Sequence, residues 1–427
     1  MSILSKNNIS VLPMEEEGVH IAYLPLVPYA VVIDSDELQQ LKNALEYEGQ
    51  QTVDSKKVIE IIKRKDEHNM TFYDTPHDVE KLRSLMILPN NKCNFHCAYC
   101  YSAGGRTNEE IPLKVLNAGI SYFLDAARAK GEKLSVSVLG GGEPLLSWKI
   151  LQPAFEHILE LRQNRSAACP ISLVTNGSIY SQEITDFLKL HDISLSISFD
   201  ILEDVQNEQR GQWDKVSVNI NRFANEGLDV ALNTVISNKN VARMTEMIEH
   251  LHKCHPLVKK VSFKLLISKD YFNTLDERRQ YYRKFVDEFF KAKKVADNHG
   301  IWLTCSYLNT CLCVTDRYCP GKFVITSEGD ISTCHTVGSR HDELYEEFVF
   351  GHIDANSGNV YINQEKLSKI LSFGTKSNEE CKDCPAHWHC AGGCYADSFH
   401  LTKKEHDAYC ESMRLFLRQY LIYKFDL

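Results

Sequence analysis

LPNNKCNFHCAYC, residues 88–100, places three cysteines in a C-x3-C-x2-C run at Cys93, Cys97 and Cys100. Three thiolates hold only three corners of a [4Fe–4S] cube, whereas a closed electron-transfer cluster normally takes four cysteines. An open position on a metal site indicates chemistry at that metal. The run therefore predicts an iron–sulfur cluster with one iron left open for substrate. Zinc is the alternative, although the run lacks a fourth ligand at zinc-finger spacing.

The whole chain is rich in cysteine, with 15 among 427 residues. A reducing compartment does not maintain structural disulfides, so this number indicates metal ligation or redox chemistry. Hydrophobic residues at 43% and charged residues at 25% are typical of a folded globular chain. A net charge of -9 without a basic block argues against a nucleic-acid partner. The chain lacks a secretory pattern and an apolar run of roughly 18 residues, so we expect a cytoplasmic protein with no membrane partner.

Short β-rich runs alternate with amphipathic stretches between residues 83 and 298. The strand-like runs are 82–88, 134–139, 171–174, 193–198, 230–236 and 261–267, and the helix-like stretches are 113–128, 148–161, 182–190, 214–225, 241–253 and 275–298. Strands that alternate with helices predict βα units on a parallel sheet. Six units fit a partial (β/α)6 TIM-like barrel better than a closed eight-fold one. In such barrels the chemistry lies on loops after the strands, where the cysteine run falls.

Residues 1–80 precede the first barrel strand and predict a small α+β module. Two strand-like runs, 20–24 and 29–33, form an expected hairpin. An amphipathic helix capped by Asp34 or Ser35 follows, and then a second helix. The module could be winged-helix-like, or it could be an extension that caps the barrel.

The barrel loops give the chain its resemblance to the radical S-adenosylmethionine (radical SAM) superfamily. GGGEP at 140–144 resembles the family's GGEP motif, TNG at 175–177 its TNG element, and SISFD at 196–200 its S-x-D pattern. In the family a glycine commonly follows that Asp, and Ile201 stands here, which leaves the local turn open. The resemblance implies that the cluster on the cysteine run binds SAM. The SAM contacts that it implies are Tyr99, Gly142, Glu143, Asn176, Ser198 and Arg210.

The C-terminal third carries a second cysteine pattern, which is similar to the SPASM domain of radical SAM maturases. Cys319 opens a C-x9-G-x4-C run, and a C-x2-C-x5-C-x3-C run and a further cysteine follow. The resemblance implies two auxiliary [4Fe–4S] clusters, so that three clusters and SAM are the expected cofactors. Auxiliary cluster I is expected on Cys313, Cys319, Cys334 and Cys394, and auxiliary cluster II on Cys381, Cys384, Cys390 and Cys410. Structural zinc sites are the alternative, and Cys311 could replace Cys313.

The expected organisation is therefore an N-terminal module (1–80), a radical SAM partial barrel (81–300) and a SPASM domain (301–427). The resemblance implies that a reduced cluster on the three-cysteine run cleaves SAM to a 5′-deoxyadenosyl radical, which takes a hydrogen atom from a substrate carbon. The auxiliary clusters are plausible electron acceptors. Asp200 and Lys264 are candidates for the base that removes a proton, with a role in the SAM pocket or in a salt bridge as the alternative.

The leading hypothesis for function is a maturase that forms a thioether or carbon–carbon cross-link within a ribosomally synthesised precursor peptide. Its partners would be that peptide, with a leader bound at a sheet edge near residues 31–33, and an electron donor such as flavodoxin or ferredoxin. The runner-up is an anaerobic sulfatase-maturing enzyme that makes formylglycine from Cys or Ser, but such an enzyme would ordinarily begin close to its first barrel strand. A non-catalytic iron–sulfur or zinc scaffold is a third alternative.

Overall fold

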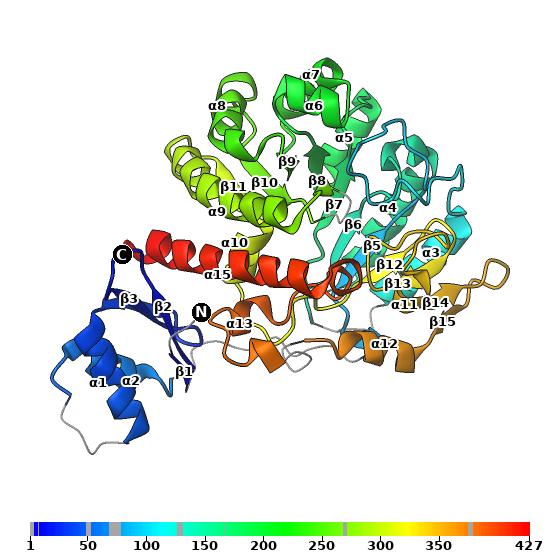
Figure 1. Ribbon diagram of the computed structural model, residues 1–427. Helices are drawn as coiled ribbons and strands as arrows, with labels where there is room; N and C mark the ends of the chain where they lie inside the picture. Colours follow the sequence, from blue (N-terminus) through cyan, green and yellow to red (C-terminus); the bar gives the residue numbers. More distant parts are fainter. Residues whose placement is uncertain are drawn as a thin grey trace.

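A curved parallel sheet wrapped by helices forms the centre of the computed structural model, which describes residues 4–6, 8–47, 53–67, 78–125, 131–165, 167–267, 271–374 and 379–427 (Figure 1). Its parallel strands are β5 (Ser84–Ile87), β6 (Ser135–Val138), β7 (Ile171–Thr175), β8 (Ile193–Ser198), β9 (Val230–Ile236), β10 (Lys260–Leu265) and β11 (Trp302–Cys305). The connecting helices are α3 (Leu113–Leu124), α4 (Trp148–Gln163), α5 (Gln182–Leu190), α6 (Glu203–Gln209), α7 (Trp213–Asn225), α8 (Met244–Cys254) and α9 (Leu275–Asn298). The predicted partial barrel is confirmed.

Alternating burial explains why these segments form strands. Along β9, Val230, Leu232, Thr234 and Ile236 are buried, whereas the residues that alternate with them are half-buried. β6 repeats the pattern, with Val136 and Val138 buried and half-buried serines between them. A period of two residues points one set of side chains at the outer helices and the other into the barrel. The sheet therefore packs its apolar face against the helices and keeps a partly polar face inside.

The sheet extends beyond the six predicted strands at both ends. β11 pairs with β10, and β12 (Phe323–Ile325) pairs in parallel with β5, the first barrel strand. Three antiparallel strands continue the sheet past β12, namely β13 (Asp330–Ser332), β14 (Val349–Ile353) and β15 (Val360–Ile362). One continuous sheet of 11 strands thus crosses the domain boundary expected at residue 300.

The remaining C-terminal helices lie beside the barrel, and the longest of them packs along α9 (Figure 1). They are α10 (Ser306–Cys311), α11 (Tyr345–Phe348), α12 (Gln364–Leu371), α13 (His387–Cys390), α14 (Asp397–His400) and α15 (Lys403–Phe425). Thr402 and Glu405 form a capping box at the start of α15. Arg278 of α9, which is 1% exposed, forms an ion pair of 2.9 Å with Glu405. No helix among the described residues has the length and apolar character that a membrane crossing demands.

The N-terminal module is a four-stranded antiparallel sheet with two helices. Its elements are β1 (Leu4–Lys6), β2 (Ile9–Pro13), β3 (His20–Leu24), β4 (Tyr29–Ile33), α1 (Ser35–Glu46) and α2 (Lys56–Arg64). Both predicted strands and both helices are present, and Asp34 caps α1 with a capping box. The sequence did not indicate β1 and β2. In the order β1-β2-β3-β4, β4 is an edge strand.

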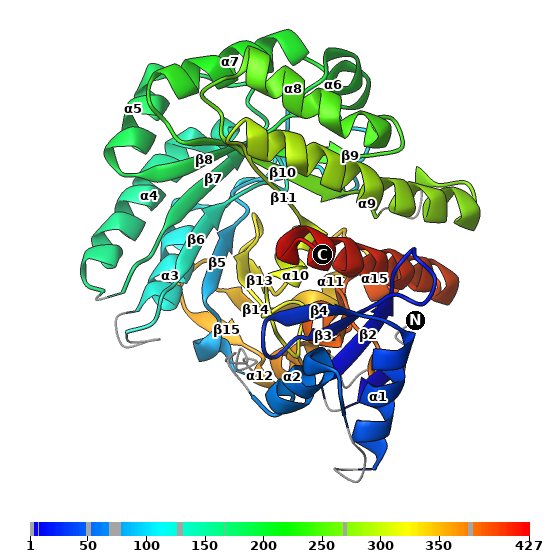
Figure 2. The same ribbon diagram turned by 90° about the vertical axis from the view of Figure 1, so that its left-hand side faces the viewer.

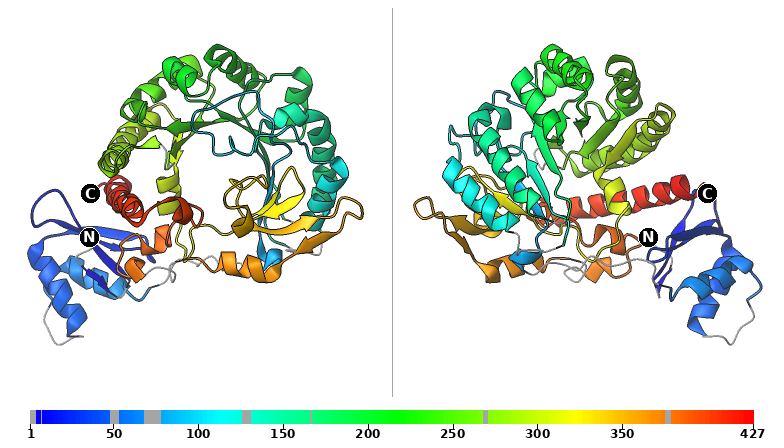
Figure 3. Two further views of the ribbon diagram at one scale, coloured as in Figure 1. Left: turned by 45° about the vertical axis from the view of Figure 1, so that its right-hand side comes forward. Right: turned by 180° about the vertical axis from the view of Figure 1, so that it is seen from behind.

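Both faces of this sheet are covered, which is why every residue of β3 is buried. Ala22 and Leu24 pack in the module's own core with α1 and α2, whereas Ile21 and Tyr23 join the core of the rest of the chain. The Tyr23 hydroxyl lies 2.8 Å from Nε2 of His389, on α13. The module thus docks on the C-terminal cysteine-rich elements (Figure 3).

Replacing Tyr23 with Phe should destabilise the docked module by about 1–3 kcal/mol, because it leaves a buried imidazole nitrogen without its partner. Urea unfolding measures this loss as a lower midpoint. Tyr29→Phe is the matched control, since the Tyr29 hydroxyl makes no hydrogen bond among the described residues. Equal midpoints for Tyr23→Phe and the control would show that the contact does not hold the module.

Candidate functional site

The loop that carries the first three cysteines is tied to the glycine-rich turn after the neighbouring strand β6. The Gly142 amide donates to the Asn90 carbonyl at 3.0 Å, and the Glu143 amide donates to the Lys92 carbonyl at 2.8 Å. A Cβ atom on Gly142 would lie 1.8 Å from the Lys92 oxygen, so only glycine allows this approach. Parallel strands bring these two loops to the same edge of the sheet.

The Glu143 carboxylate joins β6 to the end of β7. It accepts hydrogen bonds from the Thr175 hydroxyl at 2.6 Å, from the Asn176 amide at 2.7 Å and from the Leu145 amide at 3.1 Å. Burial raises the pKa of Glu143, although these three donors lower it. Its oxygens are thus already engaged by the protein, and Glu143 shapes the turn in which it lies.

A second buried carboxylate, Asp200, joins the cysteine loop to the ends of β8 and β9. It accepts from the Tyr99 hydroxyl at 2.6 Å, from Gln209 Nε2 at 3.0 Å and from the Val235 amide at 3.0 Å. Burial raises its pKa, with Arg210 and these donors acting against that shift. Asp200 is fully buried and already accepts from three groups. These contacts favour the alternative role of Asp200, in the SAM pocket or in a salt bridge. Its role as a base stays a prediction.

Arg210 is the cation that these groups share. Its Nη1 donates to the Tyr99 hydroxyl at 3.0 Å. Burial lowers the pKa of Arg210, but Tyr99, Cys97 and Asp200 together outweigh burial and raise it. Its Nε is buried and finds no hydrogen-bond partner among the described residues. An unpartnered guanidinium nitrogen beside the cysteine loop fits a site that receives an anionic ligand group.

Ile201, which stands where the family commonly has a glycine, adopts a glycine-like backbone conformation. Ile201 is fully buried and adopts a φ of 64°, in the left-handed region that glycine enters freely and β-branched residues rarely do. Its carbonyl accepts from Trp213 Nε1 at 2.8 Å. The turn after Asp200 is thus the kind a glycine would make, held here by burial and by Trp213.

The three thiols of the first cysteine run lie close to one another and receive donors from outside the run. Burial raises the pKa of Cys97, and its neighbours Cys100 and Cys93 add to that. Arg106 Nη2 lies 3.2 Å from the sulfur of Cys100, and Asn176 Nδ2 lies 3.9 Å from that of Cys93. Because N–H groups that point at sulfur favour thiolates, these residues fit a [4Fe–4S] cluster.

The C-terminal cysteines divide into two neighbourhoods. Burial, Asp397 and then Cys334 and Cys319 raise the pKa of Cys394 to about 12, which places these three thiols together. In the other group, burial and then Cys384 and Cys381 raise the pKa of Cys410 to about 12. Burial raises the pKa of Cys390, and the nearby thiols of Cys410, Cys384 and Cys381 raise it further. The two groups coincide with the two expected ligand sets, apart from Cys313.

Cys311 and Cys313 have different surroundings. Cys311 is buried near Cys305 and Cys390, whereas Cys313 is exposed. The carbonyl of Cys313 lies 2.7 Å from His389 Nδ1, the ring that also contacts Tyr23. Cys313 therefore remains the predicted fourth ligand, because Cys311 lies in the apolar core beside the other set.

A single metal ion would gather its ligands more tightly than these cysteines are gathered. Within the described ranges, no group of three or more His, Cys, Asp or Glu side chains is spaced to hold one ion. A cubane places each thiolate on a different iron, so it does not require the cysteines to meet at one ion.

Sequence reasoning gave no role to four residues that organise the site: Asn90 and Thr175, which lie within the quoted motifs, and Arg106 and Gln209, which lie outside them. Ser198 ends β8, and Lys264 lies on β10 opposite Val235 in the strand register. Burial lowers the pKa of Lys264.

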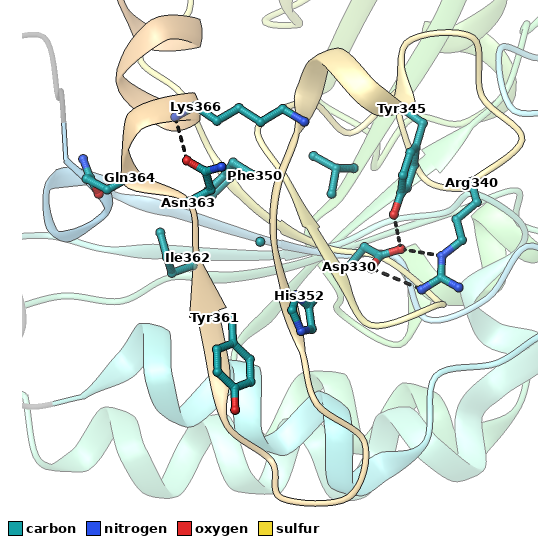
Figure 4. Close-up of a pocket in the computed structure, with 12 residues that line it drawn as sticks. Asp330, Arg340, Tyr345, Phe350, His352, Tyr361, Ile362, Asn363, Gln364 and Lys366 are labelled. Atoms are coloured by element: carbon teal, nitrogen blue, oxygen red, sulfur yellow. Dashed lines mark hydrogen bonds and ion pairs between the residues drawn. The ribbon is translucent and has the colours of Figure 1, made fainter.

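A surface cavity of about 820 Å³ lies elsewhere, on β13–β15 and α12, where Asp330 accepts from Arg340 and Tyr345 (Figure 4). The predicted site residues do not line it.

Comparison with known families agrees with this architecture. Residues 87–251 match the radical SAM superfamily, so this part of the chain is a radical SAM domain. Residues 313–385 match SPASM, an iron–sulfur cluster-binding domain, so the chain is a radical SAM enzyme of the kind that carries a SPASM domain. A radical SAM domain binds a [4Fe–4S] cluster and SAM, and a SPASM domain binds auxiliary iron–sulfur clusters.

Among proteins of known sequence, the radical SAM cyclopropyl synthase TigE of Paramaledivibacter caminithermalis is 21% identical, over 92% of this chain and 86% of TigE. Among solved structures, native anSMEcpe with bound AdoMet has a TM-score of 0.61 and 20% identity, over 80% of this chain and 98% of its own. Streptococcus suis SuiB bound to precursor peptide SuiA has a TM-score of 0.54 and 16% identity, over 94% of this chain and 97% of its own. At these identities the structural likeness shows the fold.

The two C-terminal cysteine neighbourhoods lead to a prediction of iron content. Anaerobically reconstituted protein should bind about 12 iron atoms, because three cubanes hold four each. Cys394→Ala should lower the content to about 8, as measured by iron assay and electron paramagnetic resonance of the reduced protein.

Cys169→Ala is the matched control, since Cys169 is buried between barrel elements and belongs to neither neighbourhood. It should keep the wild-type iron content. A plateau near four iron atoms in the wild-type protein would remove both auxiliary assignments.

Proposed function

We propose that this enzyme modifies a ribosomally synthesised peptide by forming a thioether or carbon–carbon cross-link within it. The observation that carries the proposal is the N-terminal sheet, which docks on the cysteine-rich elements and has β4 at its edge. An edge strand offers unpaired backbone groups to an extended peptide. The match to SuiB, whose structure is described with precursor peptide SuiA, spans 94% of this chain, and the match to TigE spans 92% of it.

The runner-up, formylglycine formation, has support from anSMEcpe, which has also been solved with the Cp18Cys peptide. That structure covers 80% of this chain and leaves a fifth of it unmatched. An additional module that could hold a leader favours a peptide with a leader over an isolated sulfatase motif. We therefore keep cross-linking as the primary function.

The assigned residues have separable tasks. Cys93, Cys97 and Cys100 would hold the SAM-binding cluster, with Arg106 and Asn176 directed at two of the sulfurs. When bound and reduced, the cluster and SAM supply a 5′-deoxyadenosyl radical that removes a hydrogen atom from a substrate carbon.

The surrounding residues position these ligands. Glu143 fixes the glycine turn against the end of β7, and Asp200 fixes Tyr99 and thereby the cysteine loop. Arg210 balances the negative charge of this region, and its Nε, which has no hydrogen-bond partner in the described ranges, is available to a ligand. Ser198 and Gly142 contribute the strand end and the turn against which SAM would lie. The two C-terminal cysteine sets would hold the auxiliary clusters.

The proposed reaction predicts a defined change in a co-expressed precursor peptide. The peptide should lose two hydrogens without gaining an aldehyde, because a new bond replaces two bonds to hydrogen. Mass spectrometry before and after treatment with a hydrazine separates the alternatives, since formylglycine reacts as an aldehyde. A product that the hydrazine labels would overturn cross-linking in favour of formylglycine formation.

Cys97→Ala should abolish both the peptide modification and the release of 5′-deoxyadenosine from SAM, because two thiolates cannot hold the open cluster. Cys254→Ala, with its thiol outside both the cysteine run and the C-terminal sets, is the control and should retain both activities. Undiminished 5′-deoxyadenosine release from the Cys97→Ala enzyme would contradict the cluster assignment.

Leader binding at β4 predicts that a charge on this edge weakens peptide affinity. Val31→Lys should lower the affinity for the precursor about tenfold while SAM cleavage without peptide is unchanged. Ile59→Lys on α2, where Ile59 is 48% exposed, is the matched control in the same module. Fluorescence anisotropy of the labelled peptide gives both affinities, and equal losses in the two variants would count against the edge.

A further inference from the structure

A basic cleft lies where the N-terminal module meets the two longest helices. Its volume is about 320 Å³, and residues of β2, α9 and α15 line it. Figure 2 shows α15 running between α9 and the strands of the module. Four arginines reach the cleft, Arg279 and Arg283 from α9 and Arg414 and Arg418 from α15, against one acidic residue, Glu411. This concentration of positive charge occurs in a chain whose net charge is -9.

Two of the arginines are engaged in holding the cleft together. Arg418 donates from Nη1 to the Pro13 carbonyl at 3.3 Å and lies 3.6 Å from the Glu15 carboxylate, which fixes the end of β2 on α15. Arg279 forms a long contact of 3.5 Å with Glu411. The walls of the cleft are therefore fixed by contacts between the elements.

The other two arginines have no such partner. Within the described part of the chain, neither Arg283 nor Arg414 forms an ion pair or a side-chain hydrogen bond, and the Nε of Arg279 is buried without a partner. Guanidinium groups bind carboxylates in a planar, two-bonded geometry and carry their charge at every physiological pH. The cleft thus presents unused donors that fit carboxylates.

Apart from Ser412, the rest of the lining is apolar, with Leu12, Pro385, Ala408 and Leu415 beside the arginine stems. Such a surface suits a chain that alternates acidic with aliphatic side chains, since the stems pack on aliphatic groups while the guanidiniums face the acids. The concave form also favours inserted side chains over a flat protein surface.

We infer that this cleft binds an acidic and aliphatic segment of the peptide substrate, apart from the residues that react. The inference rests on the proposed function and deepens it by giving the substrate a second point of attachment. One wall of the cleft, Leu12 and Pro13, belongs to the module whose β4 edge is proposed to bind the leader. A peptide held at both places gains affinity through effective concentration.

The test uses reconstituted holoenzyme and a fluorescein-labelled peptide in which Glu alternates with Leu. The same peptide with Gln in place of Glu is the uncharged probe. Wild-type enzyme should bind the acidic probe about tenfold or more tightly than the uncharged one, and the difference should shrink as salt rises. The Arg283→Gln/Arg414→Gln enzyme should bind both probes equally.

Lys284→Gln/Lys404→Gln is the matched control, because it removes the same charge from the same helices at exposed positions outside the cleft. It should keep the preference for the acidic probe. Arg414 lies near Cys410 and Cys381, so iron content is measured for each variant, and the single Arg283→Gln enzyme tests the cleft without altering that neighbourhood.

Any of three results would overturn the inference. The first is equal binding of the two probes by wild-type enzyme, and the second is an equal loss of preference in the lysine control. The third is binding of an acidic flavodoxin, lost in the arginine variant, without binding of the acidic probe, which would assign the cleft to an electron carrier. Failure of the proposed function is separate, because it would show as an unmodified precursor in an enzyme that still prefers the acidic probe.

Discussion

The Asp200 carboxylate is the contact on which the rest of the site depends. Bonds from Tyr99, Gln209 and the Val235 amide converge on it, so one side chain connects the cysteine loop, the helix after β8 and the strand β9. A buried carboxylate is costly unless it is fully hydrogen-bonded and balanced by a cation. Arg210 supplies that cation, and its own bond to the Tyr99 hydroxyl closes the network. The cysteine loop is thus placed by the barrel as well as by its own sequence.

Glu143 connects strand ends in the first half of the barrel, as Asp200 does in the second half. It joins β6 to β7 through the Thr175 hydroxyl and the Asn176 amide, and Asn176 in turn reaches toward Cys93. Two buried acids therefore hold the carboxyl ends of neighbouring strands in register around one loop. The edge of a parallel sheet supplies this geometry, because successive loops emerge side by side.

Much of the barrel could be predicted from the sequence, because its elements carry strong periodic patterns. The helices 182–190 and 275–298 have the predicted bounds, and β8 and β9 alternate clearly between buried and less buried residues. The strand β2 could not be found in this way. Both faces of the N-terminal sheet are covered, so β2 shows no alternation between polar and apolar residues.

The spacing of the cysteines predicts the cluster sites, but it does not indicate the groups that surround those cysteines. Arg106 reaches the Cys100 sulfur, and Gln209 reaches Asp200, through the folding of loops that no local pattern marks. The partner of Tyr23 lies 366 residues further along the chain, at His389. Contacts of that kind depend on tertiary structure alone, and they include the contacts that join the domains.

The contact between Tyr23 and His389 also bears on how such enzymes can be recombined. Because the module shares its buried face with the cysteine-rich elements, it is not an interchangeable attachment. A chimera that brings in a different N-terminal module would have to replace His389 and the apolar surface around it at the same time. The choice of N-terminal module is thus constrained by the interface that it forms with the cysteine-rich elements.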